Sequence, residues 1–89
     1  MSHNEGEKRY EARVDGELAG AAYYDAADDL IVFTHTEVDD AYEGQGVGST
    51  LVRAALDDVR ADGRRKVVAR CPFVSKWIDR HAEYKDLLE

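Results

Sequence analysis

A glycine-rich turn is the part of the sequence whose residue types and spacing most directly suggest chemistry. It lies between a β-like run that ends at Val38 and a helix-like run that begins near Val47, and it reads Glu43-Gly44-Gln45-Gly46-Val47-Gly48-Ser49-Thr50. Alternate glycines allow several backbone N–H groups to converge on one point, and the uncapped N–H groups of a following helix add to them. The turn lacks the lysine of a P-loop and the spacing of a dinucleotide-binding motif. It therefore predicts either an anion-binding site or a plain tight corner between strand and helix.

Three further side chains could take part in acyl or proton transfer. Cys71 is the sole cysteine and stands immediately before Pro72, at the end of a predicted strand. An ordinary thiol is only slightly ionised at pH 7, so a nucleophilic role would require a lowered pKa; an inert buried thiol is the alternative. His35 and Glu37 are alternate residues of another predicted strand and thus project from one face. The carboxylate could orient the imidazole as a general base, or the two could form a surface pair.

The composition fits one small domain and excludes several classes of partner. The chain has 89 residues, a formal net charge of -7, three histidines and one cysteine. The acidic balance disfavours nucleic acid, the histidine and cysteine spacings predict no metal site, and an intramolecular disulfide is impossible. No apolar run reaches membrane-spanning length, so we expect a cytoplasmic protein without membrane association. We expect a disordered tail over residues 1–7, which includes His3, a single domain over residues 8–89, and a monomer or homodimer.

The hydrophobic periodicity predicts the elements that position these residues. Period-two alternation and β-branched residues indicate strands, whereas apolar residues spaced by three and four indicate helices. The expected strands are 8–14, 18–24, 30–38 and 66–71, the expected helices are 47–62 and 73–80, and a short amphipathic segment covers 84–88. Gly63 ends the longer helix, and Pro72 ends the last strand. The order β-β-β-α-β-α predicts an α+β fold with a mixed sheet, in which a right-handed crossover makes the third and fourth strands parallel.

The element order and three sequence segments together resemble the GNAT superfamily of acetyl-CoA-dependent N-acetyltransferases. The segments are the glycine turn, Thr36-Glu37-Val38 and Cys71-Pro72-Phe73-Val74. The chain looks most like the short single-domain GNAT-like members with a Cys-Pro-Phe segment, and the resemblance covers residues 8–88. It implies a minimal GNAT-like fold and an acetyl-CoA-dependent N-acetyltransferase whose acceptor is a small-molecule or protein amine. A module that binds CoA or acetyl-CoA with little or no catalysis is the alternative, because the chain lacks the elements that build the acceptor pocket in larger members.

The resemblance also implies roles for individual residues. In GNAT proteins the CoA pyrophosphate binds backbone amides of a Gln/Arg-x-x-Gly-x-Gly/Ala turn, to which Gly46 and Gly48 correspond here. Glu43 takes the Gln/Arg position and cannot donate a hydrogen bond, so binding would depend on the backbone. The resemblance implies a position near the acetyl group for Cys71, and the candidate base is His35 with Glu37, or a water molecule. The implied cofactor-binding residues are Val38, Glu43, Gly44, Gln45, Gly46, Val47, Gly48, Ser49, Phe73 and Lys76, although Phe73 and Trp77 also fit the core.

Overall fold

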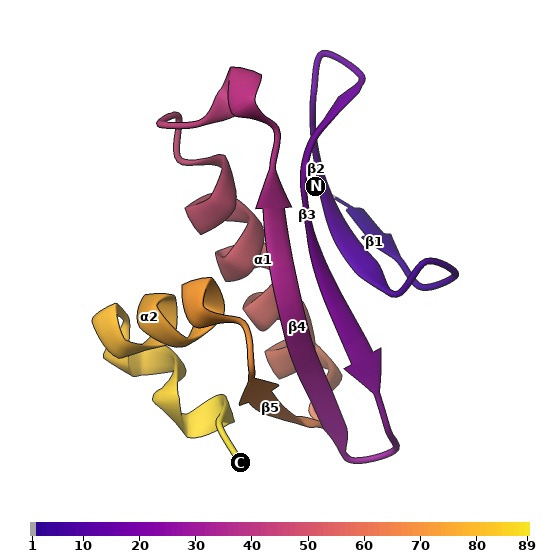
Figure 1. Ribbon diagram of the computed structural model, residues 1–89. Helices are drawn as coiled ribbons and strands as arrows, with labels where there is room; N and C mark the ends of the chain where they lie inside the picture. The colour runs from indigo at the N-terminus through magenta and orange to yellow at the C-terminus, as the bar shows by residue number, and fades with distance from the viewer. Residues whose placement is uncertain (1) are drawn as a thin grey trace.

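The computed structural model describes residues 2–89, and Met1 lies outside them (Figure 1). Its strands are β1 (Ser2–Asn4), β2 (Arg9–Val14), β3 (Glu17–Ala26), β4 (Leu30–Val38) and β5 (Lys66–Ala69). Its α-helices are α1 (Val47–Asp62) and α2 (Pro72–Arg80), and its 3-10 helices are η1 (Asp40–Tyr42) and η2 (Ala82–Leu87). The predicted strands and helices are all present, with β5 shorter than expected, and the sequence does not predict β1 or η1.

The sheet is mixed, as the predicted crossover requires. Its strands lie in the order β1-β2-β3-β4-β5; the neighbours from β1 to β4 are antiparallel, whereas β4 and β5 are parallel. Helix α1 connects the two parallel strands and lies behind β3 and β4 in the view of Figure 1. The C-terminal end of β4 and the N-terminal end of α1 therefore meet at one end of the molecule, where the glycine turn joins them.

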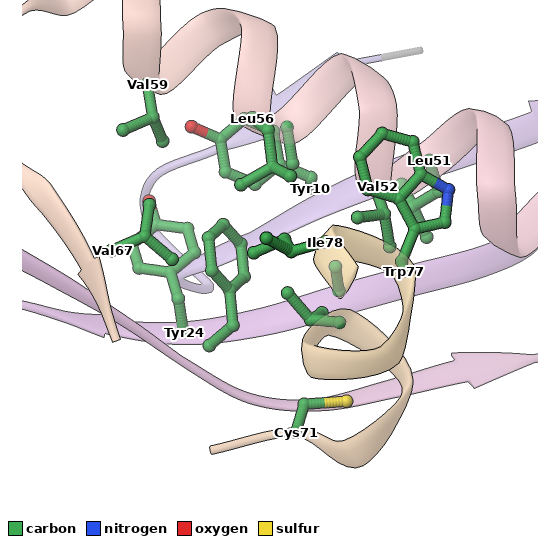
Figure 2. Packing of buried hydrophobic residues seen from close by; sticks show 14 of the residues in the cluster. Tyr10, Tyr24, Leu51, Val52, Leu56, Val59, Val67, Cys71, Trp77 and Ile78 are labelled. Atoms are coloured by element: carbon green, nitrogen blue, oxygen red, sulfur yellow. The ribbon is translucent and has the colours of Figure 1, made fainter. Parts of the chain in front are cut away.

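One hydrophobic core fills the space between the sheet and the helices (Figure 2). Helix α1 presents to it the stripe that the periodicity predicts, and α2 adds Val74, Trp77 and Ile78. The stripe consists of the partly buried Val47 and the buried Leu51, Val52, Ala55, Leu56 and Val59. Gly63 ends α1 in the left-handed conformation (φ 73°), and its N–H donates to the Val59 carbonyl at 3.1 Å. The shared core fixes the N-termini of both helices relative to β4.

The N-terminal segment differs from the disordered tail expected over residues 1–7. Residues Ser2–Asn4 form the edge strand β1, which pairs antiparallel with β2. The His3 ring stacks on Tyr10 with 4.0 Å between ring centroids, and its Nε2 shares a hydrogen bond with the Tyr24 hydroxyl. The other ring nitrogen, Nδ1, lies 3.4 Å from the Asp58 carboxylate. The polar composition does not reveal these tertiary contacts, which order the segment against the sheet.

A β-bulge in β4 decides which side chains face the core. Tyr24 pairs with Phe33 and Tyr23 pairs with His35, so β4 contains one residue, Thr34, more than β3 over this step. Phe33 is buried before the bulge, whereas His35 is exposed after it. In a regular strand these two side chains would share a face. The bulge therefore inverts the alternation for the rest of β4.

Strands β4 and β5 separate immediately after a short ladder. The ladder ends at Phe33 and Ala69, and the Phe33 carbonyl then accepts both the Arg70 N–H (3.1 Å) and the Cys71 N–H (3.0 Å). Helix α2 begins at the next residue and takes the chain away from β4. Within residues 2–89, positions 35–38 of β4 pair with β3 alone. We call their other side, toward β5, the free edge of β4.

Candidate functional site

A cleft of about 500 Å³ lies at the end of the molecule where β4, α1 and α2 meet. Its walls come from the C-terminal half of β4, from the glycine turn with the start of α1, and from the first turn of α2. The lining residues are Thr36, Val38, Tyr42, Glu43, Gly44, Gly46, Val47, Gly48, Ser49 and Phe73. All except Thr36 and Tyr42 belong to the predicted cofactor-binding set. The cleft thus brings together segments that are far apart in the sequence.

Two left-handed glycines shape the turn. Gly44 (φ 80°) and Gly46 (φ 76°) adopt angles that residues with a side chain rarely take. A Cβ at either position would meet no described atom within 4 Å, so the backbone angle, and not a lack of space, requires glycine. Gly46 is also the N-cap of α1, and within residues 2–89 no side chain caps this helix N-terminus. The first N–H groups of α1, from Val47 to Ser49, are therefore available to a ligand in the cleft.

Glycine is required at position 48 for a different reason: the absence of a side chain lets α1 and α2 approach closely. A Cβ at this position would lie 2.8 Å from Cζ of Phe73 and 3.4 Å from Cγ2 of Val38. Phe73 is 43% exposed and forms one wall of the cleft. Of the two aromatic residues that fit the core by periodicity, only Trp77 is buried. The Trp77 indole N–H donates to Ser49 Oγ at 2.9 Å and links the two helices at the cleft.

The cleft contains little charge. Among its described lining residues, Glu43 carries the sole formal charge, and lysine and arginine are absent. The Gln45 side chain turns away, and its Nε2 donates to the Ala41 carbonyl at 3.4 Å. Lys76 is exposed on α2 and lies outside the lining. Gln45 and Lys76 are thus the two predicted cofactor-binding residues that the structure leaves out of the cleft, and an anion bound there would depend on backbone N–H groups.

Thr36 and Cys71 meet at the inner end of the cleft. Thr36 points from β4 toward the helices, and its Oγ1 lies 3.5 Å from Cys71 Sγ. Cys71 is 3% exposed and is the N-cap residue of α2. Figure 2 shows it at the margin of the buried cluster. Sequence reasoning does not find Thr36 as a site residue, because a regular strand would direct His35 to the core side and Thr36 away from it.

His35 and Glu37 form the predicted pair, but on the opposite face of β4. The His35 Nε2 lies 3.4 Å from a Glu37 carboxylate oxygen, and the imidazole stacks on Tyr23 with 4.4 Å between ring centroids. Both side chains of the pair are more than half exposed, at 57% and 66%. The structure thus brings His35 and Glu37 together and separates them from Cys71, which is buried on the core side of the sheet. Proton transfer with this pair is open to a molecule that approaches the exposed face.

A second hollow, of about 320 Å³, lies at the other end of β4 and α1. Its polar lining includes His3, Tyr24, Asp58, Asp62 and Arg65. Among residues 2–89, no group of three or more His, Cys, Asp and Glu side chains is arranged to hold a metal ion. In the same part of the chain, no helix combines the length and the apolar character needed to cross a membrane.

Comparisons with known proteins identify relatives of the chain. Residues 9–87 match the family model of the GCN5-related N-acetyl-transferases. The chain is 30% identical over 80 residues to Protein NATD1 of Bos taurus, which covers 88% of this chain and 70% of that protein. It is 29% identical over 80 residues to Protein NATD1 of Homo sapiens, again with 88% of this chain and 70% of that protein covered.

A solved structure gives the same result for the fold. The chain is similar to a GCN5-like protein from Staphylococcus aureus whose solution structure was determined by NMR, with a TM-score of 0.72 and 28% identity. The match covers 100% of this chain and 91% of that chain. The minimal GNAT-like fold that the element order and motifs suggest is confirmed. The chain belongs to the family of GCN5-related N-acetyltransferases.

Proposed function

We propose that the chain binds acetyl-CoA in the cleft and transfers its acetyl group to an amine. The observation that carries the proposal is that the uncapped N-terminus of α1 and the free edge of β4 open onto one cleft of about 500 Å³. The N-terminus of α1 offers N–H groups and the positive end of the helix dipole to phosphate. The free edge of β4 offers unpaired backbone groups to an extended chain that contains amides. CoA combines these two chemical features in one molecule.

Backbone N–H groups supply the proposed phosphate contacts. Those of Val47, Gly48 and Ser49 lie at the start of α1, where the helix dipole favours an anion. A hydrogen bond to a charged oxygen contributes about 1.5–3 kcal/mol, so three such bonds anchor a pyrophosphate without a cation. Glu43 opposes this attraction at the rim of the cleft. Removing its charge should therefore strengthen CoA binding, in contrast to a family pattern that places a donor there.

The pantetheine arm would extend from the phosphate site along the free edge of β4. Its amides can pair with the backbone of positions 35–38 as an added strand does. This direction brings the thioester to the inner end of the cleft, near Thr36 and Cys71. A backbone N–H at the free edge of β4, between Thr36 and Val38, would stabilise the negative charge that develops on the thioester oxygen.

The proposed base that takes a proton from the amine is His35, on the exposed face of β4. Within the described lining of the cleft, the titratable side chains are Tyr42 and Glu43, both near the phosphate end. Burial raises the pKa of Tyr42, which keeps its hydroxyl neutral at physiological pH. His35, oriented by Glu37, instead meets an amine that arrives from the exposed face of β4. The amine nitrogen then attacks the carbonyl carbon, the C–S bond breaks, His35 takes the ammonium proton, and CoA leaves as its thiolate.

Transfer through an acetyl-Cys71 intermediate is a variant of the same reaction. In that route the Cys71 thiolate attacks the thioester, CoA leaves, and the amine then takes the acetyl group from sulfur. Cys71 is 3% exposed and its sulfur touches Thr36, which favours direct transfer. Mass spectrometry of the intact chain after mixing with acetyl-CoA distinguishes the routes. We expect no acetyl adduct on Cys71, and a stoichiometric adduct that an added amine removes would establish the covalent route.

A CoA-binding module with little catalysis is the second candidate. It is favoured by the position of His35, which lies across the sheet from the inner end of the cleft. Calorimetric titration with CoA and acetyl-CoA tests the binding that both candidates require. Release of CoA thiol from acetyl-CoA in the presence of a panel of primary amines separates them. We expect amine-dependent thiol release; binding without such release would establish the second candidate, and the absence of binding would exclude both.

A further inference from the structure

The inner end of the cleft is closed by side chains and by backbone hydrogen bonds. The Phe33 carbonyl accepts the N–H groups of Arg70 and Cys71 at 3.1 and 3.0 Å, which seals the base of the gap between β4 and β5. Above this seal, Thr36 Oγ1 and Cys71 Sγ touch at 3.5 Å. Thr36 lines the cleft, whereas Cys71 belongs to the buried cluster. The pair therefore stands between the cleft and the core.

Cys71 belongs to a closely packed core. Phe33 and Val74, which belong to the same buried cluster, are each 1% exposed. Close-packed interiors accept additional methylene groups only when side chains or backbone shift. The backbone at Cys71 is also restrained, because it is extended (φ -71°, ψ 121°) before Pro72, which fixes the first turn of α2. The wall is thus rigid, and a group larger than the available gap must displace it.

We propose that Cys71 determines the length of the acyl chain that the cleft accepts, with Thr36 as the second half of the barrier. The proposal rests on the binding of an acyl-CoA in the orientation given above, which brings the acyl group to this end of the cleft. A two-carbon group ends in front of the Thr36–Cys71 contact, whereas a four-carbon group must displace Cys71 Sγ into the buried cluster to which Cys71 belongs. The role of Cys71 is steric, so it depends on the size of the side chain and not on thiol reactivity.

The test measures, by calorimetric titration, the affinities of the wild type, Cys71→Ala and Cys71→Ser for acetyl-CoA and for butyryl-CoA. Removing Sγ in Cys71→Ala opens space at the end of the cleft, while Cys71→Ser retains a side chain of similar size and removes the thiol. One misfitted methylene in a pocket changes discrimination by about tenfold or more. We expect the wild type and Cys71→Ser to bind acetyl-CoA about tenfold or more tightly than butyryl-CoA, and Cys71→Ala to lose most of this preference.

The outcomes separate this proposal from the proposed function. If CoA itself does not bind the wild type, the proposed function fails, and the acyl-length proposal fails with it. If CoA binds and the ratio of the acetyl-CoA and butyryl-CoA affinities is the same in wild type and Cys71→Ala, only the acyl-length proposal is overturned. Thr36→Ala removes the other half of the barrier. It replaces Cys71→Ala in the same comparison of affinities if Cys71→Ala does not fold. A lost acetyl preference in Thr36→Ala supports the proposal, and an unchanged preference overturns it.

Discussion

A negative charge at position 49 should stabilise α1 and weaken CoA binding at the same time. Ser49 is the third residue of α1 after the N-cap Gly46, it lines the cleft, and its Oγ accepts the Trp77 indole N–H at 2.9 Å. In Ser49→Asp, a carboxylate can accept the same hydrogen bond. An acidic residue in the first turn of a helix contributes about 0.3–1 kcal/mol of stability through the helix dipole. The melting temperature should therefore rise slightly.

The same carboxylate repels a pyrophosphate bound at the helix N-terminus. For two unit charges about 6 Å apart, Coulomb's law gives about 0.7 kcal/mol in bulk water and about 2.8 kcal/mol at the effective dielectric constant of about 20 near a protein surface. The affinity for CoA should thus fall by about threefold to a hundredfold. High salt should reduce the loss, because it screens exposed charges.

Thr50→Asp provides the matched control. Thr50 is the next residue of the same helical turn, is exposed, and lines a separate depression that includes Val14 and Gln45. The substitution adds the same charge to the same helix and should give a similar thermal stabilisation, but it does not face the cleft. Thermal unfolding and calorimetric titration with CoA would be measured for both variants at low and high salt. Equal CoA affinities in Ser49→Asp and Thr50→Asp would refute the placement of phosphate at this helix N-terminus.

Three further predictions concern the wall of the cleft, the proposed base and the buried carboxylate of Glu11. In Gly48→Ala the new Cβ must displace the Phe73 ring, because it would otherwise lie 2.8 Å from it. The affinity for CoA should therefore fall at least several-fold. The free energy of unfolding should stay within about 1 kcal/mol of the wild-type value, because alanine favours the helix. His35→Gln should lower amine-dependent turnover by about a hundredfold or more and leave CoA affinity unchanged; an unchanged rate would remove His35 as the base. Hydrogen bonds from Arg9 and, to a lesser extent, Asn4 hold the pKa of Glu11 below its usual range. The ionised Glu11 carboxylate therefore stabilises the folded chain at neutral pH, and this stabilisation is lost as the pH falls through the lowered pKa. Glu11→Gln should therefore unfold at a lower temperature than wild type at pH 7, and the difference should shrink in acid; a constant difference would contradict this reasoning.

The elements with strong periodicity are predictable from the sequence. The bounds expected for β4 and α1 agree with the structure, because β-branched residues dominate the strand and an apolar stripe with a terminal Gly63 defines the helix. The parallel pairing of β4 and β5 follows from the helical crossover that joins them. The glycine turn is identifiable as a candidate anion site because its residue types permit the left-handed angles that Gly44 and Gly46 adopt.

The details that assign side chains to faces are not predictable in the same way. The bulge at Thr34 depends on pairing with β3, and it reverses the facing of His35 and Thr36. Strand β1 is held in place by the stacking of His3 on Tyr10, a residue of β2 that lies outside the N-terminal segment. The exposure of Phe73 depends on where α2 passes over α1. In each case a tertiary contact decides what local sequence leaves open.

An NMR titration of the backbone amides with CoA tests the proposed site most directly. Chemical-shift changes should concentrate at Val47, Gly48 and Ser49 and continue along positions 36–38 of β4, because these amides line the phosphate end and the free edge. Perturbation centred on the second hollow, around His3 and Asp58, with no change at the start of α1, would contradict the assignment of the cleft as the CoA site.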